Sequence, residues 1–157
     1  MLRSLIRGAV AGAAGTTALN AVTYLDMAVR GRPASSSPNT SVERLSERFG
    51  IPVPGSGEQR DNRVSGLGAL MGLWTGVAVG AAYGAARGLG WHPSVRTAAL
   101  VTTGVAMAGS AAPMAALGVS DPRSWSVSDW VSDVLPHLAF GLVTAASYAL
   151  GPPRRRH

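Results

Sequence analysis

The sequence predicts an all-α integral membrane protein, in which four transmembrane helices form a bundle and the second helix carries a glycine zipper. The first observation is an absence of charge. Residues 64–86 and 97–120 contain no Asp, Glu, Lys or Arg, and residues 134–153 are equally uncharged apart from His137. A helix in water needs a polar face on most turns, and these stretches lack one. Each also has the roughly 20 residues that a helix needs to cross a hydrocarbon core.

The second observation is a row of glycines. In "GALMGLWTGVAVGAAYGAARG", residues 68–88, every fourth position is glycine: Gly68, Gly72, Gly76, Gly80, Gly84 and Gly88. In water, a glycine costs a helix about 1 kcal/mol relative to alanine, and a strand repeats every second residue rather than every fourth. Between helices in lipid, glycine is useful because it lets two backbones approach closely. The row therefore also indicates a membrane.

Composition limits the class of protein. The chain has 157 residues, enough for a single membrane domain over residues 1–157, and its 14 basic residues give a net charge of +6. The arginines are scattered between apolar blocks, so we expect no nucleic-acid partner. The absence of cysteine excludes disulfides, thiolate metal sites and a thiol nucleophile. Mean hydropathy is only +0.19 because alanine and glycine are mildly apolar, and this leaves a soluble bundle with buried helices as an alternative.

The first transmembrane helix is expected at about residues 5–29, after the basic start "MLRSLIR". The same start is compatible with a signal peptide that is cleaved near "ALNA", residues 18–21. However, "GAVAGAAG" lacks the leucine-rich centre of such a peptide, and helical spacing continues through Tyr24 and Met27. We therefore favour an uncleaved helix.

A polar connection at residues 30–63 follows, with a short amphipathic helix at about residues 41–49. Thr40 and Glu43 have the spacing of a capping box, and Gly50 supplies a stop signal. Such a helix is expected to lie on the membrane or on the bundle, although it could also dock a partner. The stretch "PVPGSGEQRDN" is predicted to be loop.

Three more transmembrane helices are expected at about residues 64–87, 94–119 and 127–150. Four crossings place both termini on one side. We expect this side to be the cytoplasm of a bacterial inner membrane, because the loops there are short and purely basic, although the arginines divide equally between the two sides. Tryptophans at predicted helix ends agree with this arrangement, since indole rings favour the headgroup region: Trp91, Trp125 and Trp130.

The glycine row predicts how the helices pack. Successive glycines are displaced by roughly 40° around the axis, so the groove winds around the helix and its two halves are expected to contact two different neighbours. Small residues on the first helix have the same spacing, and Asn20 follows them as an expected interhelical hydrogen-bonding group: Gly8, Gly12 and Thr16. Self-association through this groove remains an alternative.

A candidate polar cluster consists of Asp26, Asp129, Asp133 and His137. The last three are spaced four residues apart on one helix face, and Asp26 is expected at the same membrane depth. Together they could bind a cation or pass a proton. The structural alternative is that Asp26 pairs with Arg30, Asp129 lies at a helix N-terminus and His137 donates to Asp133.

No catalytic motif is recognised: the chain lacks a P-loop, HExxH and a nucleophile elbow, so no enzyme, cofactor or metal site is expected. The function expected is a non-enzymatic, structural or accessory role in the inner membrane. The partners expected are the lipid bilayer and a second copy or another membrane protein. Two alternatives stay open: a small ion or proton transporter that uses the polar cluster, and an oligomeric glycine-zipper pore.

Three stretches resemble a group of small four-helix bacterial membrane proteins: "AGAAGTTALNAVTYLDMAVRGRP", "RDNRVSGLGALMGLWTGVAVGAAYG" and "DPRSWSVSDWVSDVLPHLAFGLVTA". The resemblance covers nearly the whole chain. It implies an uncleaved first helix and an integral membrane bundle, and it implies no activity. The positions that carry it are candidates for shared architecture or a shared site: Asn20, Tyr24, Asp26, Pro113, Asp121, Pro122, Trp125, Asp133, Pro136 and His137.

Overall fold

The computed structural model describes residues 1–151, and their regular structure is entirely helical. The prediction of an all-α protein is therefore confirmed. The arginines predicted at positions 154–156 on the inner side lie outside the described residues. The elements are α1 (Leu2–Arg30), α2 (Ser37–Phe49), α3 (Gly57–Gly88), α4 (Val95–Ala116), the short 3-10 helix η1 (Pro122–Ser124) and α5 (Val127–Leu150).

Three of the helices are long and apolar enough to cross a membrane: α3, α4 and α5. This finding agrees with the membrane prediction at the level of the individual helices. With 29 residues, α1 has sufficient length but is not among the three. Its composition explains the difference, because Arg7, Asn20 and several glycines and threonines dilute its apolar residues.

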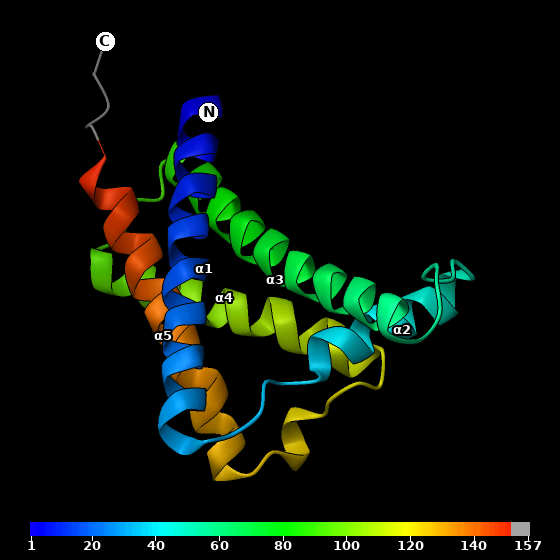
Figure 1. The fold of residues 1–157 in the computed structure, drawn as a ribbon. Coiled ribbons are helices and arrows are strands. Elements are labelled where there is room, and N and C mark those ends of the chain that lie inside the picture. The colour runs from blue at the N-terminus through cyan, green and yellow to red at the C-terminus, as the bar shows by residue number, and fades with distance from the viewer. Residues whose placement is uncertain (152–157) are drawn as a thin grey trace.

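The helices are arranged around α1 (Figure 1). It runs antiparallel to both α3 and α5 and packs against each of them, whereas α4 packs mainly against α5 and crosses α1 steeply. The C-terminal end of α3 meets the start of α1. Toward its N-terminal half, which contacts α2, α3 moves away from α1. The beginning of α1 and the ends of α3 and α5 thus lie at one end of the molecule.

Many buried residues are small, and many large apolar residues are exposed. The largest fully buried side chains are Phe140, Thr102 and Thr144, and the other buried positions of α1 and α4 are Gly, Ala and Thr. In contrast, Trp74 is 66% exposed, and many leucines are similarly exposed: Leu2, Leu25, Leu70, Leu89, Leu100, Leu135, Leu142 and Leu150. A soluble monomer rarely exposes so much apolar surface.

The predicted capping box at the start of α2 is wrong. The helix begins at Ser37, four residues ahead of the predicted start, and Thr40 is inside it with its hydroxyl donating to the Ser36 carbonyl at 3.1 Å. Pro38 explains the early start, because proline in a first helical turn removes an N–H that has no partner there.

The predicted loop "PVPGSGEQRDN" is only partly loop. Helix α3 begins at Gly57 rather than at residue 64, with Ser56 in an extended conformation before it and Glu58 in its first turn. This additional helix is tied to α2 by an ion pair of 3.1 Å between Arg60 and Glu43. The polar residues 57–63 extend an apolar helix because they can stay at its solvated end.

The other helix boundaries differ by smaller amounts. Helix α1 starts at Leu2, three residues earlier than predicted, and ends at Arg30 before Gly31, whose φ of 61° lies in the left-handed region. Helix α4 ends at Ala116 rather than residue 119. Leu117 caps α4 through the Pro113 carbonyl, and Gly118 then adopts a φ of 66° that stops the helix.

Candidate functional site

Helices α1 and α3 touch backbone to backbone where their glycines meet. A Cβ atom added to Gly12 would lie 2.9 Å from the Cα of Gly80, and one added to Gly8 would lie 2.7 Å from the Cα of Gly84. Real Cβ atoms essentially never approach other atoms under 3.0 Å. Any side chain at these positions would therefore push the two helices apart.

The remaining glycines of the row contact different neighbours. Gly76 lies against Thr16 of α1 and the ring of Phe140 from α5, and Gly88 lies against Met1 and Ser4. At the other end of α3, a Cβ on Gly68 would lie 3.1 Å from Pro38 of α2. Gly72, between these two halves, faces open space.

The structure places Asn20 away from these contacts. Its side chain is exposed on α1 and forms no hydrogen bond within residues 1–151. Instead, α1 packs closely against α5 at Gly15, a glycine outside the four-residue repeat. A Cβ on Gly15 would come within 2.8 Å of the Phe140 carbonyl of α5. The sequence pattern gave no signal for Gly15, since it lies off the predicted register.

Asp26 is fully engaged in an ion-pair network at the end of α1. Its carboxylate lies 2.7 Å from Nε of Arg30 and 2.5 Å from Nε of Arg32. Arg30 also donates to the hydroxyls of Ser128, at 2.8 Å, and Ser132, both on α5. The expected Asp26–Arg30 pair is present, and it joins α1 to the start of α5.

Asp129 caps α5. Its carboxylate accepts from the backbone N–H of Ser126 at 2.9 Å, and its own N–H donates to the Ser126 hydroxyl at 3.2 Å. This reciprocal arrangement is a capping box, which satisfies two donors that would otherwise lack partners. The carboxylate thus has a structural task at a helix N-terminus.

Asp133 and His137 form a separate pair deeper along α5. His137 Nδ1 lies 2.7 Å from the Asp133 carbonyl oxygen and 3.4 Å from the Asp133 carboxylate, and both side chains are mostly buried. On its other side, His137 Nε2 lies 3.5 Å from the hydroxyl of Ser110 on α4. These three polar groups form a row that connects α5 to α4.

The four predicted residues therefore do not converge on one point. Among residues 1–151, no three Asp, Glu or His side chains lie close enough together to hold a metal ion. The pair of Asp133 and His137 has groups that can exchange a proton, whereas Asp26 and Asp129 are held by arginines and by a helix cap. The chemistry that this arrangement could carry is thus limited to the pair and to Ser110.

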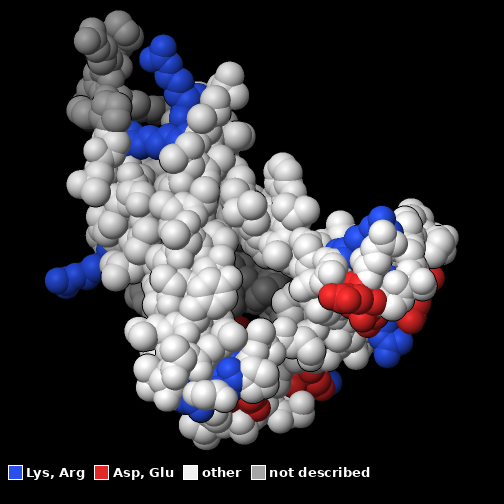
Figure 2. All heavy atoms as spheres, viewed as in Figure 1, with Lys and Arg blue, Asp and Glu red and all other residues white. Residues whose placement is uncertain are grey.

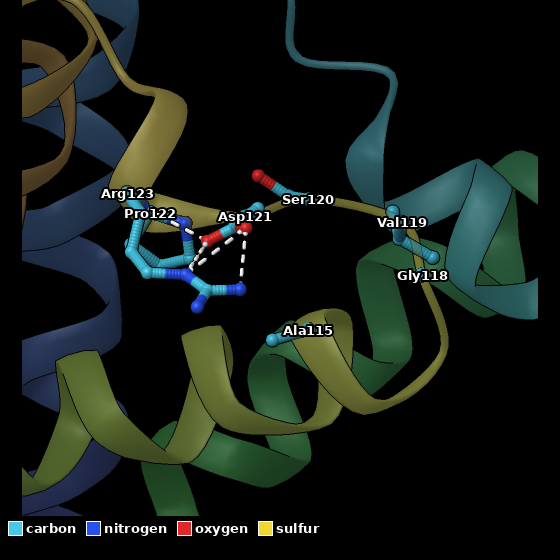
Figure 3. Close-up of a pocket in the computed structure, with 7 residues that line it drawn as sticks. All are labelled: Ala115, Gly118, Val119, Ser120, Asp121, Pro122 and Arg123. Carbon is cyan, nitrogen blue, oxygen red and sulfur yellow. Dashed lines mark hydrogen bonds and ion pairs between the residues drawn. The ribbon is translucent and has the colours of Figure 1, made fainter.

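A shallow hollow of about 550 Å³ lies between the end of α4 and η1 (Figure 3). Its charged groups face each other, since Arg123 reaches the Asp121 carboxylate at 2.9 Å. The hydrogen bond from the Arg123 side chain, followed by that from its backbone N–H, holds the pKa of Asp121 below its ordinary value of 3.8. The pair closes a tight turn, and the Ser120 hydroxyl, which also lines the hollow, accepts from the indole N–H of Trp125 at 2.8 Å.

An arginine and tyrosine cluster at the opposite end was missed by sequence reasoning. The guanidinium carbon of Arg7 lies 4.5 Å from the ring centre of Tyr148, and that of Arg87 lies 5.2 Å from the same ring. Tyr83 packs edge-on against Tyr148 with ring centres 5.0 Å apart. We call these four residues the Arg–Tyr cluster. Its members come from α1, α3 and α5, so no sequence motif could have revealed it.

Comparison of the chain with protein families, with curated proteins and with solved structures finds no match. The resemblance to small four-helix bacterial membrane proteins accordingly stays a prediction. The function must be argued from the fold and from these groups of residues.

Proposed function

We propose that the chain is a multi-pass protein of the bacterial inner membrane with a non-enzymatic, structural or accessory role. The observation that carries this proposal is the distribution of side chains: many Gly, Ala and Thr residues are buried, together with a few valines and aromatic residues, whereas most leucines and Trp74 are exposed. In lipid, helix association gains nothing from burying large apolar groups and depends instead on close packing of small residues.

In this proposal α1 also crosses the membrane, in addition to the three candidate spans α3, α4 and α5. Its glycines fit the glycine row of α3, and its other contact is α5, so it packs between two candidate membrane spans. The glycine zipper then acts as the seam between α1 and α3 and holds the four-helix bundle together without large side chains. At the end of α1 and the start of α5, the bundle is held by polar contacts of Asp26, Arg30 and Asp129. In this proposal these residues have no transport role.

Membrane fractionation tests this role. The expressed full chain is expected to stay in the pellet after alkaline carbonate extraction and to be released only by detergent. Recovery of folded chain in the supernatant without detergent would contradict the proposal. A soluble protein with the same helices would be released at the carbonate step.

A second candidate is a proton or cation pathway through Asp133, His137 and Ser110. It is favoured by the mostly buried contact of 3.4 Å between a carboxylate and an imidazole in a helix that could cross a membrane. Ionisable groups at such positions are costly and are often functional. In proteoliposomes, Asp133→Asn and His137→Gln would abolish a flux that Asp26→Asn leaves unchanged. Absence of flux in the unmodified protein would remove this candidate.

The oligomeric pore is supported least. The glycines from Gly76 to Gly84 lie against α1 within the same chain, and Gly72 is the member of the glycine row that faces open space. A pore would have to use this remaining surface together with the exposed Asn20. Crosslinking in native membranes tests it, since a strictly monomeric band argues against a pore.

A further inference from the structure

Among residues 1–151, the end of the molecule that carries the N-terminus contains Arg3, Arg7 and Arg87 and no Asp or Glu. Arg3 and Arg7 lie at the start of α1 and Arg87 lies in the last turn of α3. In Figure 2 the blue atoms beside the N-terminal end have no red atoms next to them, whereas red atoms appear at the other end and around α2. On this face, the acidic residues of the described chain therefore lie away from the N-terminal end.

Within the Arg–Tyr cluster, the two arginines approach the same buried aromatic platform from two helices. Tyr83 and Tyr148 are 5% and 6% exposed, and the Arg87 side chain donates to the Tyr83 hydroxyl at 3.3 Å. Arg7 donates to the backbone carbonyls of Tyr148 and Gly151, the latter at 2.9 Å. These contacts fix the directions of both guanidinium groups.

The partners of Arg87 differ from those of three other arginines near helix ends. Arg30, Arg60 and Arg123 each form an ion pair with an Asp or Glu at 2.7–3.1 Å. In the described range 1–151, Arg87 forms no ion pair, and its contacts are with tyrosines. Two guanidinium groups that share one tyrosine ring repel each other, and an anion between them would relieve this repulsion.

We propose that the Arg–Tyr cluster binds the phosphate of an anionic phospholipid, with Arg87 and Arg7 as the charged contacts. This inference rests on the membrane location proposed above. Guanidinium groups bind phosphate oxygens in a bidentate manner, and basic pockets between transmembrane helices on the cytoplasmic side are suited to anionic headgroups.

The surroundings favour a lipid over a free phosphate. The ring centres of Trp91 and Tyr83 are 6.0 Å apart. Trp91 lies at a helix end, where an indole ring suits the headgroup level. Leu89 and Leu150, which follow Arg87 and Tyr148 by two residues in the chain, are 77% and 87% exposed. A ligand with a phosphate and acyl chains can contact the arginines and these apolar side chains at once, whereas a free phosphate leaves the leucines uncovered.

Native mass spectrometry of the purified full chain in a neutral detergent tests this site. Phosphatidylglycerol is the anionic probe and phosphatidylcholine the neutral one, and phosphatidylglycerol is expected to bind at least about fivefold more tightly. Arg87→Gln should weaken phosphatidylglycerol binding about fivefold, and Arg87→Lys should weaken it less. Arg48→Gln is the matched control, because it removes the same charge from the exposed surface of α2. The control should bind like the unmodified protein.

Equal binding of the two lipids by the unmodified protein would overturn the proposal, as would equal losses in Arg87→Gln and Arg48→Gln. Displacement of the lipid by inorganic phosphate at comparable concentration would assign the site to free phosphate instead. If Arg87→Gln does not fold, the test uses the unmodified protein. Rising salt must then weaken its binding of phosphatidylglycerol and leave its binding of phosphatidylcholine unchanged. These outcomes are separate from carbonate extraction, so the lipid site can fail while the membrane location holds.

Discussion

Gly12 of α1 and Gly80 of α3 lie so close together that a Cβ on Gly80 would come within 2.5 Å of the Cα of Gly12. The atoms that it would meet belong to the backbone, which cannot rotate away as a flexible side chain can. Gly80→Ala is therefore expected to lower the free energy of unfolding by about 1–3 kcal/mol. Denaturant unfolding in detergent micelles, followed by circular dichroism, measures this loss.

Gly72→Ala is the matched control for this substitution. It belongs to the same glycine row, but a Cβ there meets nothing within 4 Å. Its effect is expected to stay within about 0.5 kcal/mol or to be slightly stabilising. Equal losses in the two variants would mean that the helix itself, and not the contact with α1, is sensitive to the change.

The close approach of α1 to α3 involves residues that share one spacing in the sequence. Gly8, Gly12 and Thr16 repeat at the same spacing as the glycines of α3, and a local repeat is visible without a structure. The divergence of α3 from α1 and the steep crossing of α4 depend on contacts between distant segments, which a repeat cannot report. The start of α3 was missed because polar residues at a helix end resemble a loop.

The candidate site was predictable to a smaller extent. Asp26 and Arg30 are four residues apart on one helix, so their pairing follows from helical geometry. The contact of His137 with Ser110 and the approach of Arg7 to Tyr148 join residues far apart in the chain. Only the packing of α4 and α1 against α5 brings these groups together.

Arg30 links α1 to α5 through exposed polar contacts, so its contribution to stability should be small. Arg30→Gln is expected to lower the free energy of unfolding only slightly, as is usual for ion pairs at exposed positions. Arg48→Gln, which breaks no contact within the described residues, serves as the reference. A large loss of stability relative to this reference would show that the network lies in a dry environment.

The Asp121–Arg123 turn should be sensitive to acid. The pKa of Asp121 is lower in the folded chain than its ordinary 3.8, so the ion pair contributes stability above that pH and loses it as the pH falls through the lowered pKa. The indole N–H of Trp125 donates to Ser120 beside this turn at 2.8 Å and can report on it by NMR. Its resonance should stay constant from neutral pH down to about pH 4 and then shift.

Asp121→Asn provides the comparison for this titration. The amide cannot ionise, so the Trp125 resonance of the variant should not show the acid transition. If the variant and the unmodified protein shift alike, another group causes the change. A transition in the unmodified protein above pH 3.8 would contradict the lowered pKa of Asp121.

Labelling of single cysteines with a membrane-impermeant maleimide tests the central claim, that four helices including α1 cross a bilayer. The chain contains no cysteine, so Leu2→Cys, Ser35→Cys, His92→Cys and Ser124→Cys each give one exposed target in a different segment. In sealed vesicles, we expect positions 2 and 92 to react from one side and positions 35 and 124 from the other. Reaction of positions 2 and 35 from the same side would show that α1 does not cross, and reaction of all four from either side would contradict a membrane protein altogether.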